Sequence, residues 1–162
     1  MPKDDIGFAP LRYRGLCDLE KIYRTTVKWM KQNNFKVFQN SYKDKVSGPG
    51  VSEIEIKFES KLKVDEYHRC LFKFVLKTWD TQKVQTEDGK MLYNGRIDIN
   101  IKGSIETDWQ GAYDGKTTLR DLMGKVVYNL KKNDPDQYYE DWFRERIYEL
   151  QEQIKQIIGI QT

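Results

Sequence analysis

Two residues in the middle of the chain, His68 and Cys70, are of types that could supply a general base and a nucleophile. A histidine activates a thiol only when the two side chains lie within about 3 Å of each other. The alternation of apolar and polar residues around them predicts a strand, in which side chains two positions apart are separated by about 7 Å. We therefore predict structural roles for both residues, on the side of the sheet that faces the helices.

No motif for a metal ion or for acid–base catalysis accompanies these two residues. Cys17, His68 and Cys70 lack the Cys-x-x-Cys or His-x-x-x-His spacing of a zinc site. Glu106 and Asp108 share one face of a predicted strand, but their expected neighbours on that exposed face are cations. A carboxylate beside a cation holds its charge, whereas a general acid must carry a proton. The sequence thus favours a protein without a catalytic site, a metal ion or a cofactor.

A basic face on the first predicted helix is the strongest candidate for a binding site. Four cations spaced by three, four and three residues return to one side of a helix, where they could meet phosphates, an acidic membrane surface or an acidic protein. With two arginines just upstream, the candidate anion-binding residues are Arg12, Arg14, Lys21, Arg24, Lys28 and Lys31. The alternatives are a solvated helix face, or a contact with the acidic last helix through Glu140, Glu145, Glu149 and Glu152.

The composition favours a folded, nearly neutral protein. The 162 residues are 38% hydrophobic and 33% charged, which suits a single domain over residues 1–162. The 28 basic and 25 acidic side chains leave a formal charge of +3, too small for the field of a dedicated nucleic-acid-binding protein. Two cysteines are too few for a disulfide framework, and no window approaches the roughly 18 apolar residues of a transmembrane helix, so we expect a cytoplasmic protein.

Residues 51–109 alternate apolar and charged side chains so regularly that the pairing of antiparallel strands can be predicted. Asp88-Gly89 suits a two-residue type I′ turn, which would set Leu76 opposite Ile101. In the preceding hairpin, a three-residue loop would pair Glu59 with Lys73. The outer face of this sheet then mixes lysines with carboxylates in nearly equal number, which disfavours a stacking platform for nucleic acid.

The remaining segments predict three helices and one further strand. Asp18 is a predicted N-cap, and Asp134-Pro135 announces the last helix. The apolar positions of that helix form a short seam of the coiled-coil type: Phe143, Ile147, Leu150, Ile154 and Ile157. The expected segments are an extended N-terminal arm at 1–14, a helix at 18–33, a strand at 35–45, a hairpin projecting at 80–97, a helix at 118–130 and the last helix from 134.

The resulting fold class is α+β, a two-layer sandwich in which a helix, a four-stranded antiparallel meander and two helices follow one another. Our first hypothesis for function is a non-enzymatic interaction module, which binds a protein or self-associates through the C-terminal helix. The second is a binder of an anionic surface, nucleic acid or acidic membrane, through the basic helix face. The third is an enzyme or small-ligand binder with a pocket between sheet and helices, which a deep cavity lined by His68 and polar groups would favour.

Overall fold

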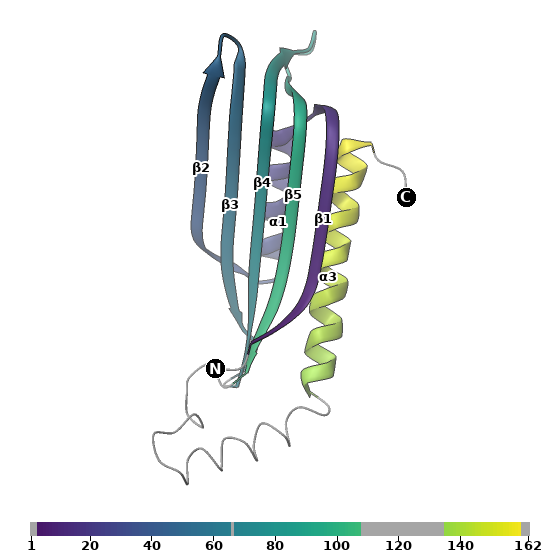
Figure 1. Cartoon of the computed structure of the whole chain (residues 1–162). Helices are drawn as coiled ribbons and strands as arrows, with labels where there is room; N and C mark the ends of the chain where they lie inside the picture. The colour runs from purple at the N-terminus through teal and green to yellow at the C-terminus, as the bar shows by residue number, and fades with distance from the viewer. Residues whose placement is uncertain (1–2, 66, 108–134, 160–162) are drawn as a thin grey trace.

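In the computed structural model, the described residues, 3–65, 67–107 and 135–159, form one antiparallel sheet with two helices on the same side of it (Figure 1). The strands lie in the order β1-β5-β4-β3-β2. The elements are β1 (Lys3–Cys17), α1 (Leu19–Gln32), β2 (Lys36–Gly48), β3 (Val51–Lys63), β4 (His68–Gln85), β5 (Met91–Thr107) and α3 (Pro135–Ile158). The chain therefore starts at one edge of the sheet, crosses it through α1, and returns strand by strand to the starting edge.

The α+β class is confirmed, but the sheet has five strands where we predicted four. The predicted N-terminal arm at 1–14 was wrong for residues 3–14, which belong to the edge strand β1 and pair with β5. Leu11 and Tyr13 face the helices, whereas Arg12 and Arg14 face outward. A bulge between Asp5 and Gly7 interrupts this alternation, so the sequence pattern is too short to predict a strand.

The two described helices begin where capping signals predict. Asp18 caps α1, its side chain accepting a hydrogen bond of 3.0 Å from the backbone N–H of Lys21. Pro135 is the first residue of α3, as expected of a proline at a helix start. The predicted helix at 118–130 lies outside the described residues.

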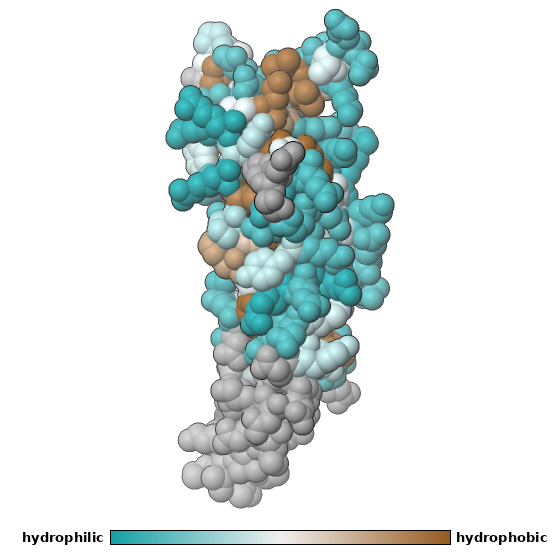
Figure 2. Space-filling view, turned by 90° about the vertical axis from the view of Figure 1, so that its right-hand side faces the viewer, coloured by the Kyte–Doolittle hydropathy of each residue, from teal (hydrophilic) through white to brown (hydrophobic). Residues whose placement is uncertain are grey.

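The apolar seam of α3 is buried inside the molecule. Phe143, Ile147, Leu150 and Ile154 are all fully buried in the same core as the sheet, the predicted Ile157 packs against this core partly buried, and Ile158 is buried as well. The outer side of the molecule along α3 is mostly hydrophilic (Figure 2). The seam is therefore not available for the self-association that its spacing suggested.

Side chains of α3 also satisfy the free edge of β1. Arg144 Nε donates a hydrogen bond of 2.8 Å to the carbonyl oxygen of Ile6, and Gln151 Nε2 donates one of 3.1 Å to that of Pro10. Proline fits this strand because an edge strand does not need every N–H for the ladder. Helix α3 thus covers an edge that could otherwise pair with another chain.

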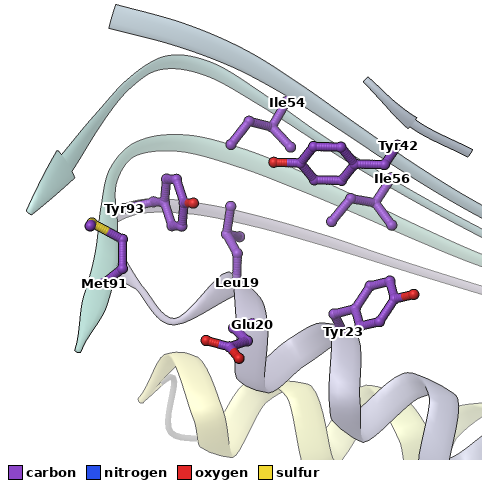
Figure 3. A pocket seen from close by; sticks show the side chains of 8 residues that line it. All are labelled: Leu19, Glu20, Tyr23, Tyr42, Ile54, Ile56, Met91 and Tyr93. Carbon is purple, nitrogen blue, oxygen red and sulfur yellow. The ribbon is translucent and has the colours of Figure 1, made fainter. Parts of the chain in front are cut away.

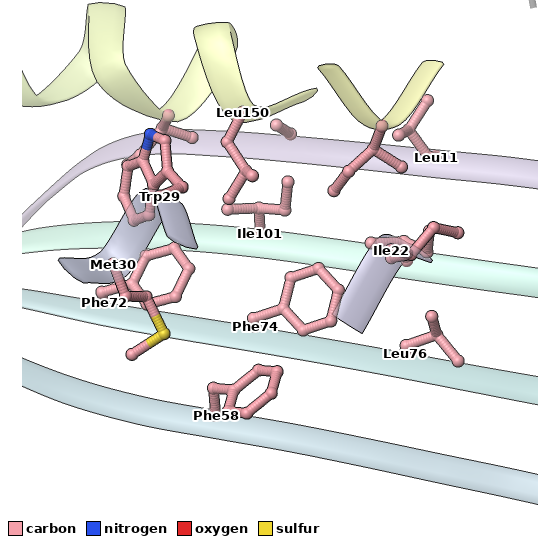
Figure 4. Close-up of a cluster of buried hydrophobic side chains, with 14 of the residues drawn as sticks. Leu11, Ile22, Trp29, Met30, Phe58, Phe72, Phe74, Leu76, Ile101 and Leu150 are labelled. Carbon is pink, nitrogen blue, oxygen red and sulfur yellow. The ribbon is translucent and has the colours of Figure 1, made fainter. Parts of the chain in front are cut away.

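The core between the layers combines aliphatic side chains with a group of packed aromatic rings (Figure 4). Trp29 of α1 lies with its ring centroid 4.7 Å from that of Phe72, and its indole N–H donates a hydrogen bond of 3.0 Å to the carbonyl oxygen of Arg146 on α3. Phe58 and Phe74 pack side by side on neighbouring strands, with centroids 5.8 Å apart. These contacts fix α1 and α3 against the sheet and against each other.

The predicted pairing of β3 with β4 is confirmed, including Glu59 opposite Lys73. The predicted pairing of β4 with β5 was wrong by two residues, because Leu76 lies opposite Ile99 and not Ile101. A shift of two keeps each side chain on its predicted face. Arg69 consequently meets Glu106 in place of the expected Asp108.

Two local irregularities cause this shift, each contributing one residue. At the hairpin tip, Gly89 has φ +80° but Asp88 does not have a positive φ, which excludes the predicted type I′ turn and fits a three-residue loop with glycine last. Lower in the strand, a bulge at Asp80, with φ +52°, displaces the ladder between Trp79 and Gln82. Within the segment predicted to project, 80–97, both Thr81 and Ile97 are buried in the body of the protein.

Candidate functional site

A cleft of about 400 Å³ opens between the start of α1 and the helix-facing side of the sheet (Figure 3). It lies toward the end of the molecule where the β2–β3 and β4–β5 hairpins turn. Four elements far apart in the sequence contribute side chains, namely α1, β2, β3 and β5. This volume is within the range of small-molecule sites in proteins.

The floor of the cleft is aliphatic and its rim contains a tyrosine and a methionine. Leu19, Ile54 and Ile56 form the floor and are almost completely buried. Tyr42 and Met91, at the rim, remain partly open to solvent, with 56% and 39% of their surfaces exposed. A cleft of this kind removes apolar ligand surface from water while leaving an entrance.

The cleft exists because the sheet continues beyond the point where α1 begins. Cys17 at the end of β1 pairs with Tyr93, and β5 extends two residues further toward the hairpin tip, to Met91. The chain turns back at Asp18, so α1 leaves this part of the sheet uncovered. An ion pair of 3.8 Å between Lys90 Nζ and Asp18 links the hairpin tip to the start of the helix.

Two phenol hydroxyl groups face each other across the cleft. Figure 3 shows the hydroxyls of Tyr42, from β2, and Tyr93, from β5, pointing toward one another. Burial, with smaller contributions from Tyr93 and Asp44, raises the pKa of Tyr42 above its usual value. The Tyr42 hydroxyl therefore keeps its proton and can donate a hydrogen bond over the whole neutral range.

The cleft has little charge in its lining. Glu20 is the only charged residue among the described residues of the lining, and it forms an ion pair with Arg24 one helical turn later. No lysine or arginine lines the cleft among the described residues. The cleft is thus suited to an uncharged molecule.

The predicted anion-binding residues do not form one surface. Arg12 and Arg14 project from the outer face of β1, and Arg12 lies 3.9 Å from Asp98. Helix α1 lies on the opposite side of the sheet, where its four cations are all exposed. Of these, Arg24 pairs with Glu20; in the described part of the chain the other three, Lys21, Lys28 and Lys31, form no ion pair, with α3 or elsewhere.

His68 and Cys70 are both buried on the helix-facing side of the sheet, as predicted. Burial raises the pKa of the Cys70 thiol to about 12, which keeps it protonated and unreactive as a nucleophile. Sequence reasoning missed the partner of His68, which is Asp65, with its Oδ2 3.0 Å from Nδ1 of the ring. The signal was present, because an aspartate three residues before a histidine in a tight turn commonly binds local N–H groups.

Asp65 organises the turn between β3 and β4. Its Oδ1 accepts hydrogen bonds from the backbone N–H groups of Tyr67, at 2.7 Å, and His68, at 2.6 Å. Its Oδ2 also accepts a longer one, of 3.4 Å, from the hydroxyl of Tyr139 on α3. This cluster is separate from the cleft and ties α3 to the turn, which is a structural role.

The outer face of the sheet carries paired charges. Arg69 Nε donates a hydrogen bond of 2.8 Å to Glu106, and Lys73 lies 3.7 Å from Glu59. The Lys73–Glu59 pair is exposed, as expected of a surface in contact with solvent, whereas Arg69 and Glu106 are half-buried beside each other. Asp108, the other member of the predicted carboxylate pair, lies outside the described residues.

Comparison with known proteins adds no family assignment. No model of a known protein family matches the chain, and no curated protein is significantly similar to it. Within the described ranges, no group of three histidine, cysteine, aspartate or glutamate residues is placed to hold a metal ion. Neither described helix is long and apolar enough to cross a membrane. The chemistry of the cleft is therefore the best basis for a functional proposal.

Proposed function

We propose that this protein is a non-catalytic module that binds a small apolar molecule in the cleft between α1 and the sheet. The observation that carries the proposal is the contrast between the buried floor, formed by Leu19, Ile54 and Ile56, and the partly exposed rim residues Tyr42 and Met91. Apolar side chains at a rim gain free energy when a ligand covers them, at about 25 cal/mol per Å² of apolar surface removed from water.

A binding role is favoured over catalysis by the groups available in the cleft. A general acid or base needs an ionisable group whose charge state can change in contact with the substrate. Glu20, the one charged group among the described residues of the lining, forms an ion pair with Arg24. Asp65 and the buried His68 are not among the residues of the cleft.

The proposal is tested by titrating the protein with N-phenyl-1-naphthylamine, an uncharged dye whose fluorescence rises in apolar surroundings. At about 0.3–0.4 kcal/mol per non-hydrogen atom, a molecule of this size gains about 5–7 kcal/mol, which corresponds to a dissociation constant of roughly 10–200 µM. We expect saturable binding at one site. Titration without saturation would contradict the proposal.

The matched variants are Ile56→Phe and Val75→Phe. Ile56 faces the cleft, whereas Val75 lies on the neighbouring strand with its side chain on the outer face. The larger ring at position 56 fills the cleft and should weaken dye binding at least tenfold, while the same ring at position 75 should leave it unchanged. Equal binding by the two variants would place the dye elsewhere.

Binding of an anionic surface by α1 stays a prediction. The exposed cations Lys21, Lys28 and Lys31 support it, since they have no acidic partner among the described residues. The separation of Arg12 and Arg14 from them, across the sheet, reduces the number of cations that one flat surface could meet at once. The geometry therefore favours the cleft.

A further inference from the structure

We infer that the ligand of the cleft is an uncharged, mainly apolar molecule with one hydroxyl or carbonyl oxygen, and that this oxygen sits between the hydroxyls of Tyr42 and Tyr93. The inference rests on the proposed function and makes it more specific. It names the chemical class of the ligand and the two groups that recognise it.

The position of the two phenols carries the first step. Tyr42 and Tyr93 come from strands on opposite sides of the cleft, yet their hydroxyls point toward one another (Figure 3). Neither forms a hydrogen bond with another described residue. A ligand oxygen placed between them can accept from both, or accept from one and donate to the other.

The apolar surroundings make that pair of hydrogen bonds selective. The apolar side chains of the walls, such as Ile54, Ile56 and Met91, offer no partner to a polar ligand atom. Of the other polar groups in the lining, Glu20 pairs with Arg24, and the hydroxyl of Tyr23 points away from Tyr93 (Figure 3). A polar group that is buried without a hydrogen bond costs free energy, so polar atoms elsewhere on the ligand would weaken binding. The cleft therefore selects a ligand whose single polar atom lies at the level of the two tyrosines.

The charges around the phenols exclude an ionised ligand. A carboxylate in the cleft would meet no cation among the described residues of the lining, and it would lie near Glu20 and near Asp44, which acts electrostatically on Tyr42. A cation would have to compete with Arg24 for Glu20. Taking an ion out of water without a partner costs more than one hydrogen bond returns.

The experiment compares three ligands that share one bicyclic skeleton: naphthalene, 2-naphthol and 2-naphthoate. Each competes with N-phenyl-1-naphthylamine for the protein at neutral pH. Because a neutral hydrogen bond contributes modestly, we expect 2-naphthol to displace the dye about three- to tenfold more effectively than naphthalene, and 2-naphthoate to be the weakest. An equal affinity for naphthol and naphthalene, or a preference for naphthoate, would overturn the inference.

Substitutions at the two tyrosines test whether the preference for 2-naphthol arises from their hydroxyls. Tyr42→Phe and Tyr93→Phe remove one hydroxyl each and keep the ring, so each should lower the affinity for 2-naphthol several-fold and leave that for naphthalene unchanged. Tyr148→Phe, on the exposed side of α3, is the matched control and should change neither. If both cleft variants bind 2-naphthol as the parent does, the inference is wrong although the ligand cleft stands. If the parent binds no dye at all, the proposed function fails first.

Discussion

Substitution of Gly103 by alanine probes the packing of α3 on the sheet at a single atom. Gly103 lies on β5 beneath α3, where an added Cβ would overlap Cδ1 of Ile147 and lie 3.1 Å from the ring of Phe143. Both of those side chains are fully buried, so neither has free space to move into. Overfilling a packed core typically costs about 1–3 kcal/mol.

A second substitution, at Ile147, measures how much of the free-energy cost of Gly103→Ala comes from the overlap with the Ile147 side chain. Ile147→Val removes the overlapping Cδ1 and alone should cost about 1 kcal/mol, as is usual for this change in a core. In the double variant the new Cβ occupies the space that the methyl group leaves. The double variant should therefore lose about 1–2 kcal/mol less than the sum of the single losses, with the contact to Phe143 preventing full recovery.

Urea denaturation of the four proteins measures this cycle, and melting temperatures should shift by about 2–4 °C for each kcal/mol. Gly48→Ala is the control, because a Cβ at Gly48 meets no atom within 4 Å and should change stability little. Additive losses, or an unchanged stability for Gly103→Ala, would refute the packing of α3 against β5.

Two further predictions concern turns. Gly89→Val should destabilise the protein by about 1–2 kcal/mol, because position 89 has φ +80°, which a β-branched residue resists. No atom lies within 4 Å of an added Cβ at this position, so the cost comes from the backbone conformation alone. An unchanged melting temperature would contradict the turn. Burial raises the pKa of Asp65, but hydrogen bonds from His68 and Tyr67 outweigh this effect and lower the pKa below its ordinary value of 3.8. The ionised Asp65 therefore stabilises the folded protein above pH 3.8, and this stabilisation is lost as the pH falls through the lowered pKa. The melting temperature of Asp65→Ala should thus lie well below that of the parent at pH 6 and approach it near pH 2; a gap independent of pH would show that the carboxylate charge does not matter.

The sequence predicted the faces of the strands better than their pairing. Side-chain faces depend only on a period of two, which β3, β4 and β5 keep through most of their length. The pairing of two strands shifts with each residue that is inserted at a turn or a bulge. The hydrophobic pattern does not reveal the residue inserted at the Asp80 bulge or the third residue of the hairpin loop. The two errors, of one residue each, added to a shift of two and so left the predicted core correct.

The edge strand and the residues of the cleft were not predicted, for different reasons. Strand β1 is hidden by a bulge near Gly7 and by Pro10, two features that sequence reasoning associates with loops. The cleft has no local pattern at all, because Tyr42 and Tyr93 stand far apart in the sequence and meet only in the folded sheet. Each alone is an ordinary strand tyrosine.

The lengths of the elements explain why an apolar surface is left uncovered. Strand β4 has 18 residues, which at about 3.3 Å each reach about 59 Å, whereas the 14 residues of α1 rise only about 21 Å at 1.5 Å each. Helix α3 is longer, but it packs along β1 at one edge of the sheet, whereas β2 lies at the opposite edge. The sheet is apolar beyond the reach of the two described helices, and at the hairpin end the residues that these helices leave uncovered include those of the cleft. A bound molecule would complete the second layer there, which links the shape of the fold to the proposed function.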